Sequence, residues 1–115
     1  MTMTPADFLT AAEKVAASAS SEGDRRTAIG RAYYAAFLEA REKAGLSNTR
    51  ESVHKEVADW IFAHVPGHTP QKFQSLHALR IRADYRLNDT LAASAMNDAI
   101  RYSKQVIKAL GGTTV

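Results

Sequence analysis

The segment from Leu79 to Tyr85 carries side chains suited to chemistry inside a stretch that otherwise repeats like a buried helix. On a helix, Arg80 and Asp84 are four residues apart and His77 lies three residues before Arg80, so these polar side chains share one seam. Arginine binds phosphate groups through paired hydrogen bonds. The seam therefore indicates a functional cleft, and a phosphate-bearing ligand is one candidate for it.

Apolar positions form two stripes beside this polar seam, since successive residues of a helix advance by about 100°. The first stripe comprises Leu76, Leu79, Ala83 and Leu87, and the second comprises Ala78, Ile81 and Tyr85. A helix with two apolar faces needs two partners. Either a fifth helix folded across the second stripe or a second protomer would cover it.

Helical periodicity runs through the whole chain, and no alternating strand pattern interrupts it, so the fold is predicted to be all-α. Thr4 and Pro5 are typical of a helix start, and residues 20–23 close that first helix. The second helix should run from about residue 24 to residue 44, and Gly45 should form its C-terminal cap. Tyr33 and Phe37 are expected to lie in the core.

The later helices are bounded by residues with capping or helix-breaking character. Residues 48–51 should cap the third helix, which ends before the Pro-Gly turn at residues 65–67. Thr69 and Pro70 open the fourth helix, and residues 88–90 end it and cap the fifth. The fifth helix is clearly amphipathic and ends at the glycine pair near the C-terminus.

The composition indicates one modest domain covering residues 1–115, since 45% of the residues are apolar and no break divides the chain. The absence of cysteine excludes disulfides, thiolate metal sites and cysteine nucleophiles. A net charge of +3 fits nucleic-acid contact as well as an ordinary solvated surface. No stretch approaches the roughly 20 apolar residues that span a bilayer, and no targeting signal opens the chain, so a cytoplasmic protein without membrane contact is expected.

Several other chemistries find no support in the sequence. No glycine-rich loop leads into a Lys-Ser or Lys-Thr pair, so a phosphate-cradling loop is absent. His64 and His68 are four residues apart, but Pro66 and Gly67 break the helix between them, which favours a solvated loop over a metal site. Neither a metal ion nor a cofactor is expected.

Three segments together resemble the HEPN superfamily of small helical bundles. They are Arg31-Ala32-Tyr33-Tyr34-Ala35-Ala36-Phe37, Val53-His54-Lys55 and Leu79-Arg80-Ile81-Arg82-Ala83-Asp84-Tyr85. More narrowly, they are similar to a prokaryotic branch with a Tyr-Tyr-Ala helix and a later Arg-x-x-Ala-Asp-Tyr helix. The resemblance implies an up-and-down bundle of four main helices plus a fifth helical element. It also implies a homodimer formed through the helix containing residues 70–88 and, as in many relatives, a metal-independent endoribonuclease or a toxin–antitoxin component.

Active members of that superfamily carry an arginine, four intervening residues and a histidine. Arg80 matches the arginine, while Tyr85 occupies the histidine position. In RNA cleavage through the 2′-hydroxyl, the arginine binds the scissile phosphate and the histidine, with a pKa of about 6.5, moves protons. Tyrosine, with a pKa of about 10, is a poor general base. His77 or His54 would then have to move the protons, whereas Tyr85 would donate a hydrogen bond or stack on a base.

The candidate catalytic residues are therefore Arg80, Asp84, Tyr85 and His77, and the candidate binding residues are Arg31, Tyr34, His54 and Arg82. The leading hypothesis is an RNA-directed protein of a prokaryotic toxin–antitoxin or defence system. One alternative is a non-catalytic module that binds a nucleotidyltransferase or an antitoxin, and another is a cleft that binds a nucleotide. If the protein is not a catalyst, the Arg80–Asp84 pair would orient the helix and Tyr85 would pack at a protein contact.

Overall fold

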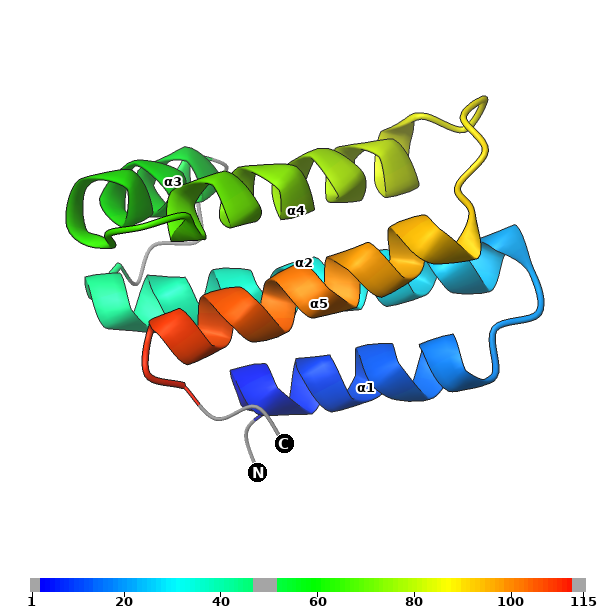
Figure 1. Ribbon diagram of the computed structural model, residues 1–115, viewed down its shortest axis with the longest axis horizontal. Coiled ribbons are helices and arrows are strands. Elements are labelled where there is room, and N and C mark those ends of the chain that lie inside the picture. Colours follow the sequence, from blue (N-terminus) through cyan, green and yellow to red (C-terminus); the bar gives the residue numbers. More distant parts are fainter. Residues whose placement is uncertain (1–2, 47–51, 113–115) are drawn as a thin grey trace.

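The computed structural model describes residues 3–46 and 52–112, which fold into five helices and contain no strand. These helices are α1 (Pro5–Ala17), α2 (Glu22–Ala44), α3 (Val53–His64), α4 (Thr69–Tyr85) and α5 (Ala93–Ala109). In Figure 1, α2 and α5 lie in the middle, with α1 along one side of them and α3 and α4 along the other. The prediction of an all-α bundle is confirmed.

The central helix α2 contacts each of the other four helices. Its fully buried alanines let the neighbouring helices approach closely, because a methyl group adds little width to the packing face. These alanines are Ala28, Ala32, Ala35, Ala36 and Ala40. Tyr33 and Phe37 are also buried on α2, as expected from the sequence. Helix α2 is therefore the element from which the other four are positioned.

The starts and ends of the first two helices follow local capping rules. Thr4 caps α1 as predicted, because its side chain accepts from the Asp7 N–H while the Asp7 carboxylate accepts from the Thr4 N–H. Helix α2 begins two residues earlier than predicted, since the Ser21 hydroxyl accepts from the Asp24 N–H. Gly45 ends α2 in the left-handed conformation with φ 71°, as predicted.

The boundaries between α4 and α5 differ from the prediction. Helix α4 starts at Thr69 but ends at Tyr85, and α5 begins at Ala93 after an Ala92 cap without a side-chain hydrogen bond. Residues 88–90 therefore do not cap α5, and the Asp89 carboxylate binds Arg82 Nε at 3.1 Å instead. The predicted cap of α3, at residues 48–51, lies outside the described residues.

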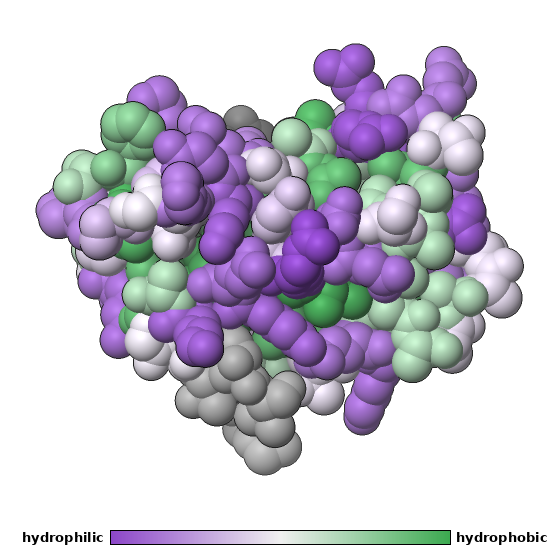
Figure 2. Space-filling model, in the orientation of Figure 1, coloured by the Kyte–Doolittle hydropathy of each residue, from purple (hydrophilic) through white to green (hydrophobic). Residues whose placement is uncertain are grey.

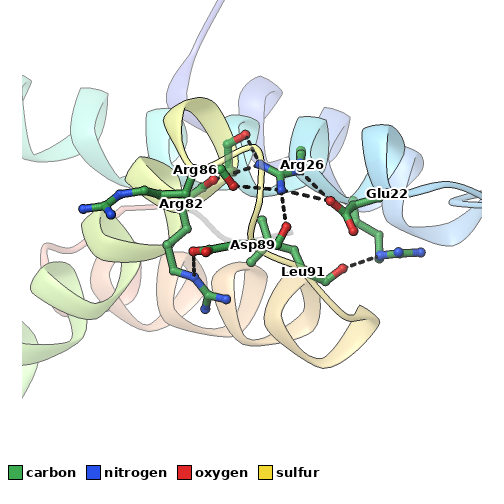
Figure 3. Close-up of polar contacts among 8 residues, drawn as sticks. Glu22, Arg26, Arg82, Arg86, Asp89 and Leu91 are labelled. Atoms are coloured by element: carbon green, nitrogen blue, oxygen red, sulfur yellow. Dashed lines mark hydrogen bonds and ion pairs between the residues drawn. The ribbon is translucent and has the colours of Figure 1, made fainter.

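The connection between α4 and α5 is held by two arginines of α2 (Figure 3). Arg25 donates to the carbonyl oxygen of Leu91 at 2.7 Å, and Arg26 is paired with the Glu22 carboxylate at 2.9 Å. The Arg26 guanidinium also donates, over 2.6–3.1 Å, to the backbone carbonyl oxygens of Arg82, Ala83, Arg86 and Asp89. The last carbonyls of a helix have no partner within the helix. Arg26 therefore caps the C-terminal end of α4 from another helix.

The two apolar stripes of α4 meet different surroundings. Leu76 and Ala83 are buried in the core, but Leu87 is 76% exposed, because α4 ends before that residue. Leu87 therefore does not extend the apolar stripe of α4 to which the sequence pattern assigned it. On the second stripe, Tyr85 is 66% exposed and Ala78 is exposed as well, so α5 does not cover this face.

Helix α5 packs its apolar side against the bundle and turns its polar side outward. Figure 2 shows a broad hydrophilic band crossing the face on which α5 lies, with apolar atoms in smaller areas beside it. Met96, Ala99 and Val106 are buried on the inner side of α5, in agreement with its predicted amphipathic character. Among the described residues, no helix is both long and apolar enough to cross a membrane.

Ser103 is a buried polar residue on the inner side of α5. It is fully buried, and its hydroxyl oxygen has no hydrogen-bond partner among the described residues. An unpaired buried hydroxyl costs about 1–3 kcal/mol. We therefore expect Ser103→Ala to raise the free energy of unfolding by about 1 kcal/mol in urea titration.

The control for this variant is Ser75→Ala, at an exposed position in the middle of α4. Both changes bring the same gain in intrinsic helix propensity, so their difference isolates the buried hydroxyl. A stabilisation by Ser103→Ala no larger than that by Ser75→Ala would show that the hydroxyl carries no penalty.

Candidate functional site

Helices α2, α3 and α4 bring together a group of aromatic, histidine and charged side chains, here called the Arg80 cluster. Its members are Tyr33, Tyr34 and Phe37 of α2, His54 of α3, and His77, Arg80, Asp84 and Tyr85 of α4. The cluster unites residues from all three segments that carry the HEPN resemblance.

Tyr33 is the centre of the Arg80 cluster, since it is fully buried and its ring contacts rings from three helices. Its ring centroid lies 5.8 Å from that of His54 and 5.3 Å from that of His77, and both pairs are stacked. The Tyr33 hydroxyl also lies 2.8 Å from His54 Nδ1, within hydrogen-bonding distance. His54 stacks on Phe37 with centroids 4.3 Å apart. Packing therefore holds both imidazole rings, and the hydrogen bond with Tyr33 also fixes that of His54.

Arg80 lies over the aromatic rings, and only 13% of its side chain is exposed. Its Cζ is 5.4 Å from the Tyr33 centroid and 5.7 Å from the centroids of Tyr34 and Tyr85. Arg80 Nε is 2.8 Å from Asp84 Oδ2, yet this N–H makes no hydrogen bond, because it is not directed at the oxygen. Asp84 therefore balances the guanidinium charge without satisfying the buried Nε–H.

The two histidines of the cluster favour their neutral forms. Burial lowers the pKa of His54 below its usual value, and the positive charge of Arg80 and the neighbouring His77 lower it further. Burial and Arg80 lower the pKa of His77 in the same way. Burial raises the pKa of the Tyr33 hydroxyl well above its ordinary range. At neutral pH, the cluster therefore holds two imidazoles able to accept a proton beside a permanent cation.

Acidification should destabilise the fold through these two histidines. Because their folded pKa values are lowered, the unfolded chain binds protons at higher pH than the folded chain does. The contribution of each group is complete above its unfolded pKa of about 6.5 and is lost as the pH falls through the range below it. Urea unfolding near pH 7.5 and near pH 5.5, about one unit either side of that value, should show this loss.

The matched variant for this pH dependence replaces both histidines, as His54→Gln with His77→Gln. It should lose less stability on acidification than the wild type, because the groups that take up the protons are gone. If the double variant loses as much stability as the wild type between the two pH values, the acid sensitivity has another origin.

Two of the remaining predicted site residues, Arg31 and Arg82, lie outside the Arg80 cluster. Arg82 is on another side of α4, where it binds Asp89 and lines a groove facing α5, so the structure separates it from Arg80. Arg31 is exposed, and its guanidinium lies 6.0 Å from the centroid of the Phe8 ring. Tyr34 is half-buried within the cluster.

Two residues that sequence reasoning did not assign to a site have prominent places in the structure. Tyr33 was expected only in the core, yet its ring and hydroxyl also position the histidines. Arg26 holds the end of α4, which carries Asp84 and Tyr85. The Tyr33-Tyr34 pair in the sequence indicated the role of Tyr33. No local sequence pattern distinguishes Arg26 from the other arginines.

A groove adjoins the Arg80 cluster between α2 and α4. Its volume is about 190 Å³, and it is lined by Arg26, Thr27, Gly30, Arg31, Tyr34 and Asp84. Tyr34 and Asp84 belong to both the groove and the cluster, so the groove borders the cluster, although Arg80 itself does not line it.

Among the described residues, no group of three or more histidine or acidic side chains is placed to hold a metal ion. No family model matches the chain, and neither a curated protein nor a solved structure matches it. The resemblance to the HEPN superfamily therefore rests on the three sequence segments alone.

Proposed function

We propose that this protein is a metal-independent endoribonuclease of the HEPN type, acting within a prokaryotic toxin–antitoxin or defence system. One observation carries the proposal. His54 and His77 lie in the same cluster as Arg80, with their ring centroids 6.5 Å apart, although Tyr85 occupies the histidine position of the motif. Two imidazoles beside a guanidinium are a set of groups that supports RNA cleavage through the 2′-hydroxyl.

In the proposed reaction, Arg80 binds the scissile phosphate and stabilises the negative charge that develops on it. One histidine removes the proton from the 2′-hydroxyl, whose oxygen then forms a bond to phosphorus while the bond to the 5′-oxygen breaks. The second histidine gives a proton to the departing 5′-oxygen. The phosphate favours protonation of this second histidine, because a nearby negative charge raises the pKa of an imidazole. The products are a 2′,3′-cyclic phosphate and a 5′-hydroxyl.

The proposal is tested by cleavage of labelled RNA in the presence of a chelator, which suppresses metal-dependent contaminants. Replacing both His54 and His77 by asparagine should lower the cleavage rate by about 10²-fold to 10⁴-fold, the range for removing general acid–base catalysis. His64→Asn is the control, because His64 is exposed at the end of α3 and bonded to the Trp60 carbonyl oxygen. Equal cleavage by the double variant and the wild type would exclude these histidines as the proton carriers.

A second candidate function is a non-catalytic interaction module that binds a nucleotidyltransferase or another protein, including a second copy of this chain. The uncovered stripe of α4 favours it, since Tyr85 is 66% exposed there and Ala78 is exposed beside it. Exposed aromatic residues are common anchors of protein interfaces. Under this alternative, the purified protein binds its partner through α4 and leaves RNA intact.

A further inference from the structure

The groove between α2 and α4 has open space on its α2 side and a hydrogen-bond acceptor, the Asp84 carboxylate, on its α4 side. Thr27, Gly30, Arg31 and Tyr34 recur at three-residue and four-residue steps, so they lie along one side of α2, and Asp84 faces them from α4. A methyl group added at Gly30 would lie 4.0 Å from Asp84 Oδ1. The glycine therefore leaves space directly in front of the carboxylate.

The polar groups of the groove differ in how many hydrogen bonds and ion pairs they already make within the protein. The Arg26 guanidinium is fully engaged with Glu22 and the backbone of α4, and the Thr27 hydroxyl donates to the Gly23 carbonyl oxygen. Asp84 Oδ2 faces Arg80, whereas Asp84 Oδ1 accepts no hydrogen bond from any described residue. Arg31 makes no ion pair within residues 3–46 and 52–112. A ligand would therefore meet one unengaged carboxylate oxygen, which has two lone pairs, together with the Arg31 guanidinium and the Tyr34 ring.

From this arrangement we infer that the groove binds a guanine base next to the scissile phosphate, so that the enzyme prefers RNA with guanine at the cleavage site. This inference rests on the proposed ribonuclease function. An ionised carboxylate only accepts hydrogen bonds. Guanine presents two adjacent N–H donors on its pairing edge, whereas adenine and cytosine place an acceptor nitrogen beside their single amino group. The two lone pairs of Asp84 Oδ1 can accept both donors of guanine, whereas uracil offers a single N–H between two carbonyl oxygens, so Asp84 favours guanine over the other three bases.

The other walls of the groove fit a nucleotide in the same orientation. Tyr34 is half-buried and offers an aromatic surface on which a base can stack. Its ring also lies 5.7 Å from Arg80 Cζ, so the base and the phosphate bound by Arg80 would be neighbours along one chain. Arg31, which is exposed, reaches a flanking phosphate. Because the groove and the Arg80 cluster share Tyr34 and Asp84, we expect one nucleotide in the groove to place its phosphate beside the cluster.

The first arm of the test measures binding to the full chain by calorimetry, with inorganic phosphate and with the 5′-monophosphates of guanosine, adenosine, cytidine and uridine. The guanosine nucleotide should bind about 10-fold more tightly than the others, as expected for a paired contact to a base edge. Gly30→Val should remove this preference by filling the groove, and Gly23→Val is the matched control at an exposed position of α2. Asp84→Asn should also remove the preference, which keeps the test valid if Gly30→Val fails to fold.

The second arm maps the cleavage sites on RNA oligonucleotides that differ only in one base. The inference is supported if the wild type cleaves beside guanine, if Gly30→Val loses this preference and if Gly23→Val keeps it. Equal binding of the four nucleotides, with phosphate still bound, overturns the base site and leaves the proposed ribonuclease intact. A preference for free guanosine nucleotide without guanine at the cleavage sites also overturns it, since the groove would then serve a free nucleotide. If neither phosphate nor RNA is bound or cleaved, the proposed function fails and this inference with it.

Discussion

Replacing Arg80 by alanine should lower RNA cleavage by about 10²-fold to 10³-fold, the usual cost of removing one group that stabilises transition-state charge. Arg80 is the only residue of the Arg80 cluster with a permanent positive charge. Without it, nothing in the cluster opposes the charge that develops on the phosphate. Arg80→Lys should recover only part of the activity, because an ammonium keeps the charge but lacks the planar fork that binds phosphate through two hydrogen bonds. The measurement is the initial cleavage rate in chelator.

Arg82→Ala is the matched control for this prediction. Arg82 lies two residues further along α4 and pairs with Asp89, away from the cluster. Its removal takes away the same side chain and the same charge from the same helix, so a general loss of positive charge affects both variants alike. If Arg82→Ala lowers cleavage as much as Arg80→Ala, the effect is electrostatic and the Arg80 cluster is not the site.

Arg26→Ala should be the most destabilising single substitution of a charged residue in the described chain, at about 2–4 kcal/mol. Arg26 has only 13% of its side chain exposed and donates to four backbone carbonyl oxygens as well as to Glu22. Hydrogen bonds to charged groups contribute about 1.5–3 kcal/mol each, and part of this is recovered when water reaches the freed carbonyls. Urea titration and the melting temperature should both report the loss.

The control for Arg26→Ala is Arg31→Ala, on the same helix and exposed. Surface substitutions of this kind stay within about 0.5 kcal/mol of the wild type. Arg26→Lys should rescue little, because one ammonium cannot reach the set of carbonyls that the guanidinium spans. If Arg26→Ala and Arg31→Ala have similar free energies of unfolding, the interactions of Arg26 with the end of α4 contribute little to stability.

The helix boundaries that the sequence predicted well are those fixed by neighbouring residues. Thr4 with Asp7 starts α1, and Gly45 ends α2, because each cap involves residues within one turn. The end of α4 was placed too late, and the cap of α5 was wrong. Arg26 holds this region from a position 56 to 63 residues earlier in the chain, and such a contact leaves no local pattern.

In the candidate site too, contacts within one helix could be predicted from the sequence, whereas contacts between helices could not. The seam of His77, Arg80 and Asp84 could be predicted because all three lie on one helix at the required spacing. The helical period also separates Arg82 from Arg80, since residues two apart point to different sides. The approach of His54 depends on how α3 packs against α2 through Tyr33, which the sequence of either segment alone does not specify.

The product ends of RNA cut by the wild-type protein in chelator test the central claim most directly. The proposed mechanism predicts fragments that end in a 2′,3′-cyclic phosphate and begin with a 5′-hydroxyl, because the attacking group is the adjacent 2′-oxygen. Fragments with 5′-phosphate and 3′-hydroxyl ends would contradict it, since these arise from attack by water and do not need the paired histidines beside Arg80.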